Sequence, residues 1–518
     1  MRGVIAAGAP TTAEAGARIL ERGGNAVDAA VAACFATAVG EPTLTSLAGG
    51  GMILYRDGHS GEAVVCDCFA DVPRTPAADV AGLDFRAVDL DFGPTTQRFY
   101  IGRGSAAVPG VIPGLCTALE RWGSLPLGEV VRPACEMLRE GRPLGPYQGR
   151  AAKLLDPILT HSAAGRRIFA PHGRIIAAGD RFRLPELADT LEAMARQGWQ
   201  EHYRQAMVPA MLAQFGPAHG GLLTPADLDG YQIVFREPLE LSYRQIQVLT
   251  VPPPHIGGSM ICLMLGLLAQ ERLGSLPLQG TAHALRLCCA MQVADEARTE
   301  AARALVGRSF EGWHRRFAEL VAAGSLGAAP SPGGPGSTTH VSAIDAAGTA
   351  CAVTFSYGEG NGYFIGDTGI AMNNLMGEED LHPAGFGRAP GGTRLATMMA
   401  PTLLVEGDGS VTAMGTGGAN RIRSAIVQVV SLLCDFGLGP EPAVAAPRVH
   451  FEKGELNAEM FGRDDGGASL AALGAAKLVR FDEPNLFFGG VHLVRRAPDG
   501  TLSGAGDPRR GGVCRVVE

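Results

Sequence analysis

The sequence has no long basic run and no excess of positive charge. Its 518 residues carry 44 Lys and Arg against 52 Asp and Glu, for a net charge of −8. Nucleic acids and anionic membrane surfaces attract basic patches, so this balance argues against either as a partner. Residues 1–20 lack the charged start and apolar core of a signal peptide, and the most apolar run, residues 260–269, is too short to span a bilayer. We therefore expect a cytoplasmic protein with no membrane partner.

The cysteines and glycines give no strong sign of a metal, disulfide or phosphate site. The 11 cysteines are scattered and odd in number, which favours reduced thiols over a disulfide framework. Cys66 with Cys68, and Cys288 with Cys289, lack a second pair at ligand spacing, so we expect small buried side chains there. Glycine, at 72 residues, is about twice its usual share, yet no stretch fits a nucleotide-binding pattern. We expect no metal and no cofactor, and interpret the glycines as close packing around an active site.

The most informative stretch begins where a loop rich in proline and glycine, residues 330–336, becomes a strand. Proline lacks an N–H and glycine costs backbone entropy, so that loop disfavours both a helix and a regular ladder. Residues 338–344 then alternate at period two, residues 345–349 indicate a turn, and residues 350–357 indicate a returning strand. The sequence predicts a β-hairpin entered from a loop.

The register of this hairpin brings two hydroxyl groups together. If Asp345 pairs with Thr349 across the turn, the two residue numbers of every opposed pair in the hairpin add to the same total. Thr338 then faces Ser356 on the same side of the sheet. If the chain were cut before Thr338, its free α-amine, with a pKa near ~7.7–8.0, could act as a general base beside its own hydroxyl. This is the N-terminal threonine form of nucleophilic catalysis, and the alternative is an ordinary polar turn that enters an edge strand.

A strand at residues 411–415 followed by a helix at residues 421–436 predicts an anion site. Gly418 and Ala419 lie at the junction, and backbone amides at the start of a helix point toward an anion. We expect these N–H groups to stabilise an oxyanion. We interpret His340, near Thr338, as structural and facing away from it.

Three other segments carry weaker predictions. Residues 11–14 read as a capping box that opens a helix ending near residue 21. Asn25 reads as the cap of a second helix, which is apolar on most sides and therefore buried. Residues 381–392, rich in glycine and proline, form either a mobile lid or a passive connector.

The chain resembles the γ-glutamyltransferase family along nearly its whole length. Residues 338–342 match the Thr-Thr-His-x-Ser motif that begins that family's small subunit. Each further match is weak alone, but the ordered set is highly specific. The other matching stretches are residues 23–30, 49–51, 108–110, 252–258, 372–374, 399–402 and 506–509.

This resemblance implies an N-terminal-nucleophile hydrolase of the α+β class, a four-layer αββα sandwich with two stacked antiparallel sheets. It implies self-cleavage between Ser337 and Thr338, giving a large subunit (residues 1–337) and a small subunit (residues 338–518) folded together as one domain. Thr338 would be the nucleophile, with Ser356 contacting its amine. Gly418 and Ala419 match the family's oxyanion-forming glycine pair, although the second glycine is replaced here. A backbone N–H survives any replacement except proline.

The resemblance also implies a substrate site, and here the chain departs from the family. Arg74 matches the arginine that grips a substrate carboxylate. Where the family holds the glutamyl amine with an asparagine, a glutamine or glutamate, and an aspartate, this chain has Gly358, Leu375 and Glu378. The serine pair that assists the arginine reads Thr397 and Met398, the last residues of this predicted substrate site. Because Leu375 and Met398 cannot make the expected hydrogen bonds, we expect the mechanism to be kept and glutamyl recognition to be altered.

Three functions follow from these patterns. The first is transfer or hydrolysis of a γ-glutamyl group, as from glutathione, through an acyl-enzyme on Thr338. The second is the same chemistry on another small carboxylate-bearing amide, as in oxamate amidohydrolases or cephalosporin acylases. The third is an unprocessed, catalytically silent binding protein. The sequence leaves open which substrate and acceptor are used, and whether two subunit pairs form a homodimer.

Overall fold

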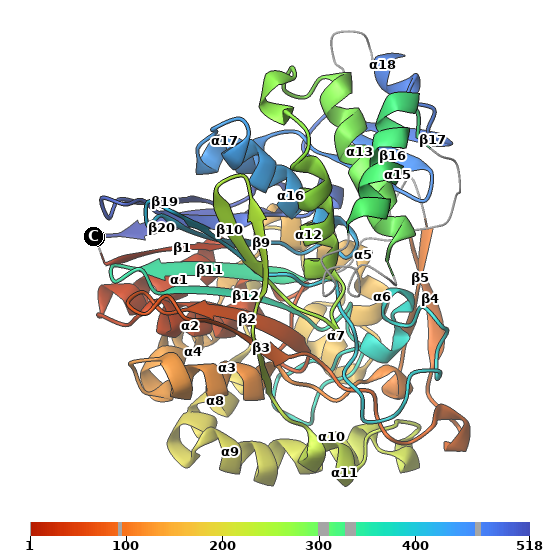
Figure 1. Ribbon diagram of the computed structural model, residues 1–518. Helices are drawn as coiled ribbons and strands as arrows, with labels where there is room; N and C mark the ends of the chain where they lie inside the picture. The colour runs from red at the N-terminus through yellow and green to blue at the C-terminus, as the bar shows by residue number, and fades with distance from the viewer. Residues whose placement is uncertain (1, 92–95, 299–309, 327–337, 462–467) are drawn as a thin grey trace.

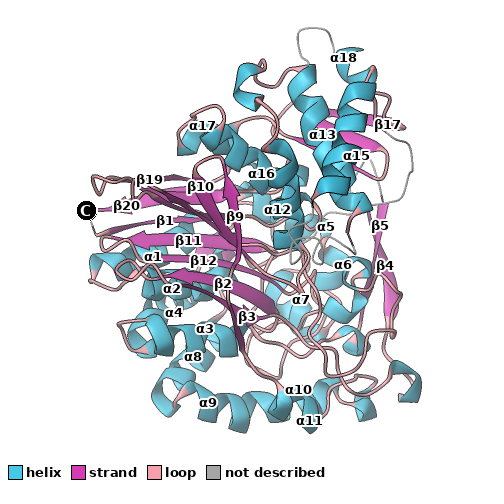
Figure 2. Ribbon diagram, in the orientation of Figure 1, coloured by secondary structure: helices cyan, strands magenta, loops and turns pink. Residues whose placement is uncertain are grey.

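Two antiparallel sheets lie face to face between two layers of helices in the computed structural model, which describes residues 2–91, 96–298, 310–326, 338–461 and 468–518 (Figures 1 and 2). The seven-stranded sheet has the order β20 (Val513–Val517), β1 (Gly3–Ala7), β11 (Thr339–Asp345), β12 (Ala350–Ser356), β2 (Gly50–Arg56), β3 (Ala63–Cys68) and β8 (Val234–Arg236). The six-stranded sheet has the order β19 (Leu502–Ala505), β18 (His492–Arg496), β14 (Val411–Gly415), β13 (Thr402–Glu406), β10 (Ile246–Thr250) and β9 (Leu239–Tyr243).

Helices cover the outer face of each sheet. Below the seven-stranded sheet in Figure 1 lie α1 (Pro10–Glu21), α2 (Ala26–Gly40), α3 (Val111–Trp122), α4 (Leu127–Glu140) and α8 (Pro185–Gln197). Above the six-stranded sheet lie α12 (Gly257–Leu268), α13 (Thr281–Glu296), α16 (Arg421–Cys434) and α17 (Pro440–Ala445). This is the four-layer α+β sandwich that was predicted.

The smaller elements sit at the periphery of the sandwich (Figure 1). The helices among them are α5 (Pro146–Leu154), α6 (Asp156–Leu159), α7 (Ala163–Phe169), α9 (Trp199–His202), α10 (Val208–Phe215), α11 (Pro225–Gly230), α15 (Glu311–Ala323) and α18 (Ala468–Ala471). The strands are β4 (Arg86–Asp91), β5 (Thr96–Ile101), β6 (Arg142–Pro143), β7 (Arg181–Phe182), β15 (Val449–Glu452), β16 (Glu455–Glu459) and β17 (Lys477–Phe481).

Strands from both sides of position 338 interleave in each sheet. In the seven-stranded sheet, β11 and β12 lie between β1 and β2, so segments after residue 338 are hydrogen-bonded on both sides to segments before it. In the six-stranded sheet, β13 pairs with β10. A cut before Thr338 would therefore leave two chains that share both sheets, which is why we keep residues 1–337 and 338–518 as one predicted domain.

The hairpin has the predicted register. The Asp345 N–H donates to the Thr349 carbonyl at 3.1 Å, and Thr339 pairs with Phe355. Thr338 and Ser356 are the next opposed positions. Side chains along β11 alternate between its two faces. Val341 packs with α2, and the residue on each side of it faces the six-stranded sheet.

The first helix begins differently from the prediction. The capping box at residues 11–14 is wrong, because α1 already begins at Pro10, whose fixed φ suits the first turn. The Thr12 hydroxyl instead donates to Glu41 at 2.8 Å. The second helix is confirmed: Asn25 accepts hydrogen bonds from the N–H groups of Val27 and Asp28, and α2 is buried on nearly every side.

The four cysteines that stand close together in the sequence are buried, as predicted. Cys66, Cys68, Cys288 and Cys289 are free and buried. In the described part of the chain, no helix combines the length and apolar character needed to cross a membrane.

Candidate active site

A cavity opens where β11 begins and β12 ends, beside the junction of β14 and α16. Its lining surrounds about 550 Å³ of space, open solvent at its mouth included. Seven of the predicted site residues line it: Thr338, Ser356, Leu375, Glu378, Thr397, Met398 and Ala419. Predicted site residues as far apart in the sequence as positions 338 and 419, which differ by 81, thus line one cavity, as expected.

Thr338 and Ser356 lie side by side at the floor of the cavity. They are opposed positions one step beyond the last Cα pair of the hairpin, and both are buried. The Ser356 hydroxyl accepts a hydrogen bond from the Gly358 N–H at 3.1 Å. Gly49 packs directly behind them, since a Cβ there would stand 2.0 Å from the Ser356 carbonyl oxygen. The glycines at residues 49–51 therefore act as close packing around the site, as predicted. Ser337 lies outside the described residues.

The two residues predicted to stabilise an oxyanion lie at the junction of β14 and α16. Gly418 has a φ of +126° and Ala419 a φ of +47°, immediately before the helix. The carbonyls of both residues already accept bonds from the first turn, from the N–H groups of Arg421 and Ile422. Amides at this end of a helix lack intrahelical acceptors and so remain free to bind an anion. Ala419 lines the cavity, whereas Gly418, its neighbour in the chain, is not among the lining residues.

The positions expected to hold a glutamyl amine form a mixed wall. Burial raises the pKa of the Glu378 carboxyl well above its usual range, and the nearby carboxyls of Glu359 and Asp380 raise it further. Gly358 abuts this group, because a Cβ there would stand 2.2 Å from Glu378 Oε1. Leu375 is fully buried in the same wall. The space that a family asparagine would fill at position 358 is thus occupied by Asn374 and Glu378.

Thr397 and Met398 form the opposite side. The Thr397 hydroxyl accepts the Met399 N–H at 3.1 Å, and its carbonyl accepts the Ile256 N–H at 2.9 Å. Met398, together with Phe69, gives this side an apolar surface. These residues therefore give the cavity a partly apolar lining.

Arg74 does not line the cavity. Its guanidinium donates to the Ala226 carbonyl at 2.8 Å and contacts the Asp227 carboxylate at 3.3 Å, in the first turn of α11. The cation that does line the cavity is Arg298, which donates to Asn420 at 3.2 Å. Sequence reasoning missed Arg298 because no local motif marks it, and it enters the site from the end of α13. The role of Arg74 as a carboxylate clamp stays a prediction.

His340 is structural, but not for the reason predicted. Residues two apart in a strand share a face, so His340 lies on the same side of β11 as Thr338 rather than facing away. Its two ring nitrogens contact the hydroxyls of Thr354 and Ser342, each at 2.7 Å. Burial lowers the pKa of His340 well below its usual range. A neutral ring with both nitrogens engaged therefore joins β11 to β12 within the seven-stranded sheet.

The segment at residues 381–392 is anchored in this structure. Leu381 lines the cavity, and His382 contacts the Leu375 carbonyl at 3.1 Å. Phe386 packs edge-on against Phe85 and Tyr100. Whether this segment opens during turnover stays a prediction.

Comparisons with known proteins identify relatives along nearly the whole chain. The family model described as Gamma-glutamyltranspeptidase matches residues 12–517. An Acylase ACY 1 proenzyme from Pseudomonas sp. (strain SE83) is 32% identical, covering 97% of this chain and 91% of the relative. A Glutathione hydrolase proenzyme from Escherichia coli (strain K12) is 29% identical, covering 98% and 90%.

Among solved structures, a cephalosporin acylase from Bacillus halodurans matches with a TM-score of 0.82 at 25% identity, covering 100% of this chain and 96% of that one. Fold, ordered motifs and near-complete coverage point the same way. The chain belongs to the γ-glutamyltranspeptidase family and is an N-terminal threonine hydrolase or acyltransferase.

Proposed function

We propose that the chain cuts itself before Thr338 and then acts as an acylase-like amide hydrolase on a small carboxylate-bearing amide. The observation that carries this proposal is the cavity itself, which is lined by Thr338, Ser356 and Ala419 together with Leu375 and Met398. This arrangement supports the second of the three functions that the sequence predicts.

Self-cleavage would begin with attack of the Thr338 hydroxyl oxygen on the Ser337 carbonyl carbon. The Ser337–Thr338 C–N bond breaks, the amine takes the hydroxyl proton, and an ester remains. Water then hydrolyses the ester, which releases the Ser337 carboxylate and restores the Thr338 hydroxyl with a free α-amine. The two products would be the large and small subunits, which share both sheets.

Turnover would reuse the same hydroxyl. The α-amine of Thr338 accepts the hydroxyl proton as the oxygen attacks the substrate amide carbon. The N–H groups of Gly418 and Ala419 stabilise the tetrahedral oxyanion, and removal of one such donor typically costs about 10²–10³ in kcat. Collapse expels the amine, which takes the proton, and leaves an acyl-enzyme. Water releases the acyl group as an acid, or an acceptor amine takes it as a new amide.

The wall chemistry supports an acyl group with an apolar segment and a carboxylate. Phe69, Leu375 and Met398 supply apolar surface, and Arg298 supplies the cation. Sites built to bind a polar group reject analogues that lack it, but an apolar wall gives an amino group no hydrogen bond. A γ-glutamyl substrate is the second candidate, favoured by Glu378, whose carboxyl could bind an ammonium group.

A denaturing gel and two matched anilides test the proposal. The purified protein should give two unequal bands, and a Thr338→Ala variant should give one. Glutaryl and γ-glutamyl anilides differ only by the α-amino group, and we expect the glutaryl compound to have the higher kcat/KM. A preference for the γ-glutamyl compound would favour the second candidate. One band with no turnover of any amide would support a catalytically silent binding protein.

A further inference from the structure

Arg510 contacts the nucleophile from behind. It ends the short turn at Pro508–Arg510 and is 5% exposed. Its Nη1 donates to the Thr338 carbonyl oxygen at 3.0 Å. A Cβ built on Gly417 would stand 2.0 Å from that same oxygen and 2.6 Å from Arg510 Nη1. The guanidinium therefore fits between the nucleophile's backbone and the loop that leads to the oxyanion donors, where only glycine leaves room for it.

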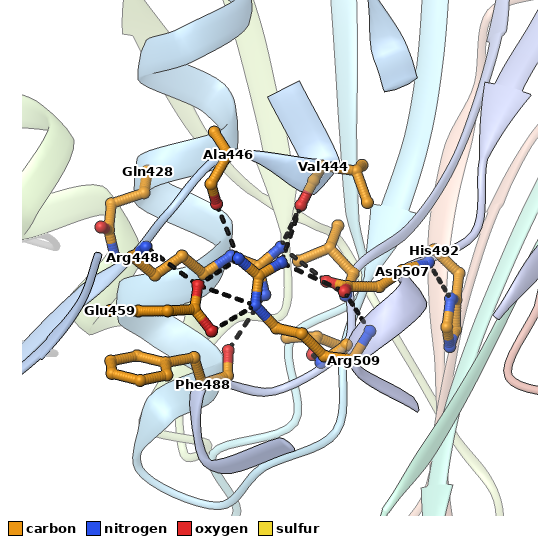
Figure 3. Close-up of polar contacts among 12 residues, drawn as sticks. Gln428, Val444, Ala446, Arg448, Glu459, Phe488, His492, Asp507 and Arg509 are labelled. Carbon is orange, nitrogen blue, oxygen red and sulfur yellow. Dashed lines mark hydrogen bonds and ion pairs between the residues drawn. The ribbon is translucent and has the colours of Figure 1, made fainter. Parts of the chain in front are cut away.

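A buried ion network fixes the turn that carries Arg510 (Figure 3). Asp507 accepts hydrogen bonds from Arg448 Nη2 at 2.6 Å and from the Val491 N–H at 3.0 Å. Arg509 donates to Glu459 at 2.9 Å and to the Val444 carbonyl at 3.0 Å. Charges in such a network are satisfied only in one geometry, so it holds the backbone next to Arg510 in place.

We propose that Arg510 is a positioning residue that orients Thr338 and keeps its freed α-amine neutral near pH 7. This inference rests on the function proposed above. A residue's amine and carbonyl oxygen are three covalent bonds apart, so a cation bonded to the oxygen lies close to the amine. A nearby like charge disfavours the protonated amine, and only the neutral amine can accept the hydroxyl proton.

Other charged or titratable groups lie around Thr338, but among the described residues only Arg510 has a side-chain hydrogen bond to its carbonyl. Burial lowers the pKa of His492 to about 4 and that of His340 well below its usual range, so neither adds a cation near pH 7. Burial raises the pKa of Glu41, which lies behind the strand. On the cavity side the charged residues are Arg298, Glu378 and Asp380. The two carboxyl groups would raise the pKa of the Thr338 α-amine, whereas Arg298 would lower it as Arg510 does. The contribution of Arg510 must therefore be measured with variants of Arg510 itself.

The test compares the pH dependence of kcat/KM in wild type, Arg510→Lys and Arg510→Met. We expect the acid limb of Arg510→Met to move up by about half to one pH unit, because the amine becomes easier to protonate. We also expect kcat to fall by about ten- to a hundredfold, because the nucleophile loses its orientation. Arg510→Lys keeps the charge but not the planar fork, so its acid limb should stay in place while kcat falls. Arg495→Met is the matched control, since Arg495 lies on β18, pairs with Glu406 at the end of β13 and does not line the cavity.

Each outcome decides the proposal. Wild-type kcat with an unshifted limb in Arg510→Met overturns it. An Arg510→Met chain that folds but stays uncut supports the role of Arg510 in positioning Thr338. The acid limb of Arg510→Lys then tests the effect of the positive charge. Gly417→Ala disturbs the same contact from the other side and should lower kcat; if it and Arg510→Met both fail to fold, Arg510 serves the fold only and the proposal is overturned. A wild-type protein that neither cuts itself nor turns over amides contradicts the proposed function instead.

Discussion

The Glu41 carboxylate accepts a hydrogen bond from the Thr339 hydroxyl at 2.6 Å, one residue after the nucleophile. The same carboxylate accepts the Thr12 hydroxyl at 2.8 Å. Glu41 thus joins the end of α2 and the first turn of α1 to the start of β11. Nothing in the local sequence marks this contact, because its partners are 29 and 298 positions away.

This contact predicts an unusual dependence of stability on pH. Burial raises the pKa of Glu41, so the folded chain binds a proton more tightly than the unfolded chain. The resulting stabilisation is fully present below the unfolded pKa and is lost as pH rises through the folded pKa. Glu41→Gln should therefore gain stability relative to the parent as pH rises above about 4.5. Urea unfolding of both chains in the uncut Thr338→Ala background measures this, and a constant difference across pH would contradict it.

Ser356 should matter for turnover more than for folding. Its hydroxyl faces Thr338, and one hydrogen bond is worth about 1 kcal/mol, or roughly a fivefold to tenfold change in rate. We expect Ser356→Ala to lower kcat by about that factor, and Ser356→Thr to retain activity because the hydroxyl remains. Steady-state kinetics with melting temperatures test this; equal kcat values for Ser356→Ala and the parent would exclude the contact.

Restoring polar groups in the wall should change substrate choice. A Leu375→Gln, Met398→Ser variant gains hydrogen-bonding groups where the cavity is now apolar. We expect kcat/KM for γ-glutamyl anilide to rise by about tenfold or more relative to glutaryl anilide, since matched polar sites discriminate strongly. The single variants serve as controls. An unchanged ratio would place the cause of specificity elsewhere.

Replacing Gly358 by the asparagine that the family has at this position should destabilise the protein. Its φ is +68°, and a Cβ there would stand 2.0 Å from Asn374 Oδ1 and 2.2 Å from Glu378 Oε1. We expect Gly358→Asn alone to lower the melting temperature by several degrees, about 1–3 kcal/mol of strain. Adding Glu378→Asp, with its shorter side chain, should recover part of the loss. Full stability of the single variant would show that the wall adapts.

Substitutions of Arg298 and of Arg74 should have different effects on KM. If Arg298 binds the substrate carboxylate, Arg298→Gln should raise KM by about tenfold to a hundredfold, because a charge-assisted hydrogen bond is worth about 1.5–3 kcal/mol. Arg74→Gln should leave KM within about twofold, since its guanidinium already contacts Asp227 outside the cavity. The reverse pattern would restore Arg74 as the carboxylate clamp.

The sequence alone determined the parts that depend on neighbours along the chain. Alternation and the turn at residues 345–349 set the hairpin register, so the meeting of Thr338 and Ser356 was predictable. The same holds for the Asn25 cap and for the strand–helix junction at Gly418 and Ala419. The capping box at residues 11–14 failed because a proline one position earlier had already begun the helix.

Tertiary structure decided which distant side chains face the nucleophile. Arg298 enters the cavity while Arg74 turns to α11, and Arg510 reaches Thr338 across 172 positions. No periodicity or turn preference encodes such contacts, because they arise when two sheets pack and bury charges that must then find partners. The cytoplasmic location and the self-cleavage stay predictions, whereas the fold and the family are established.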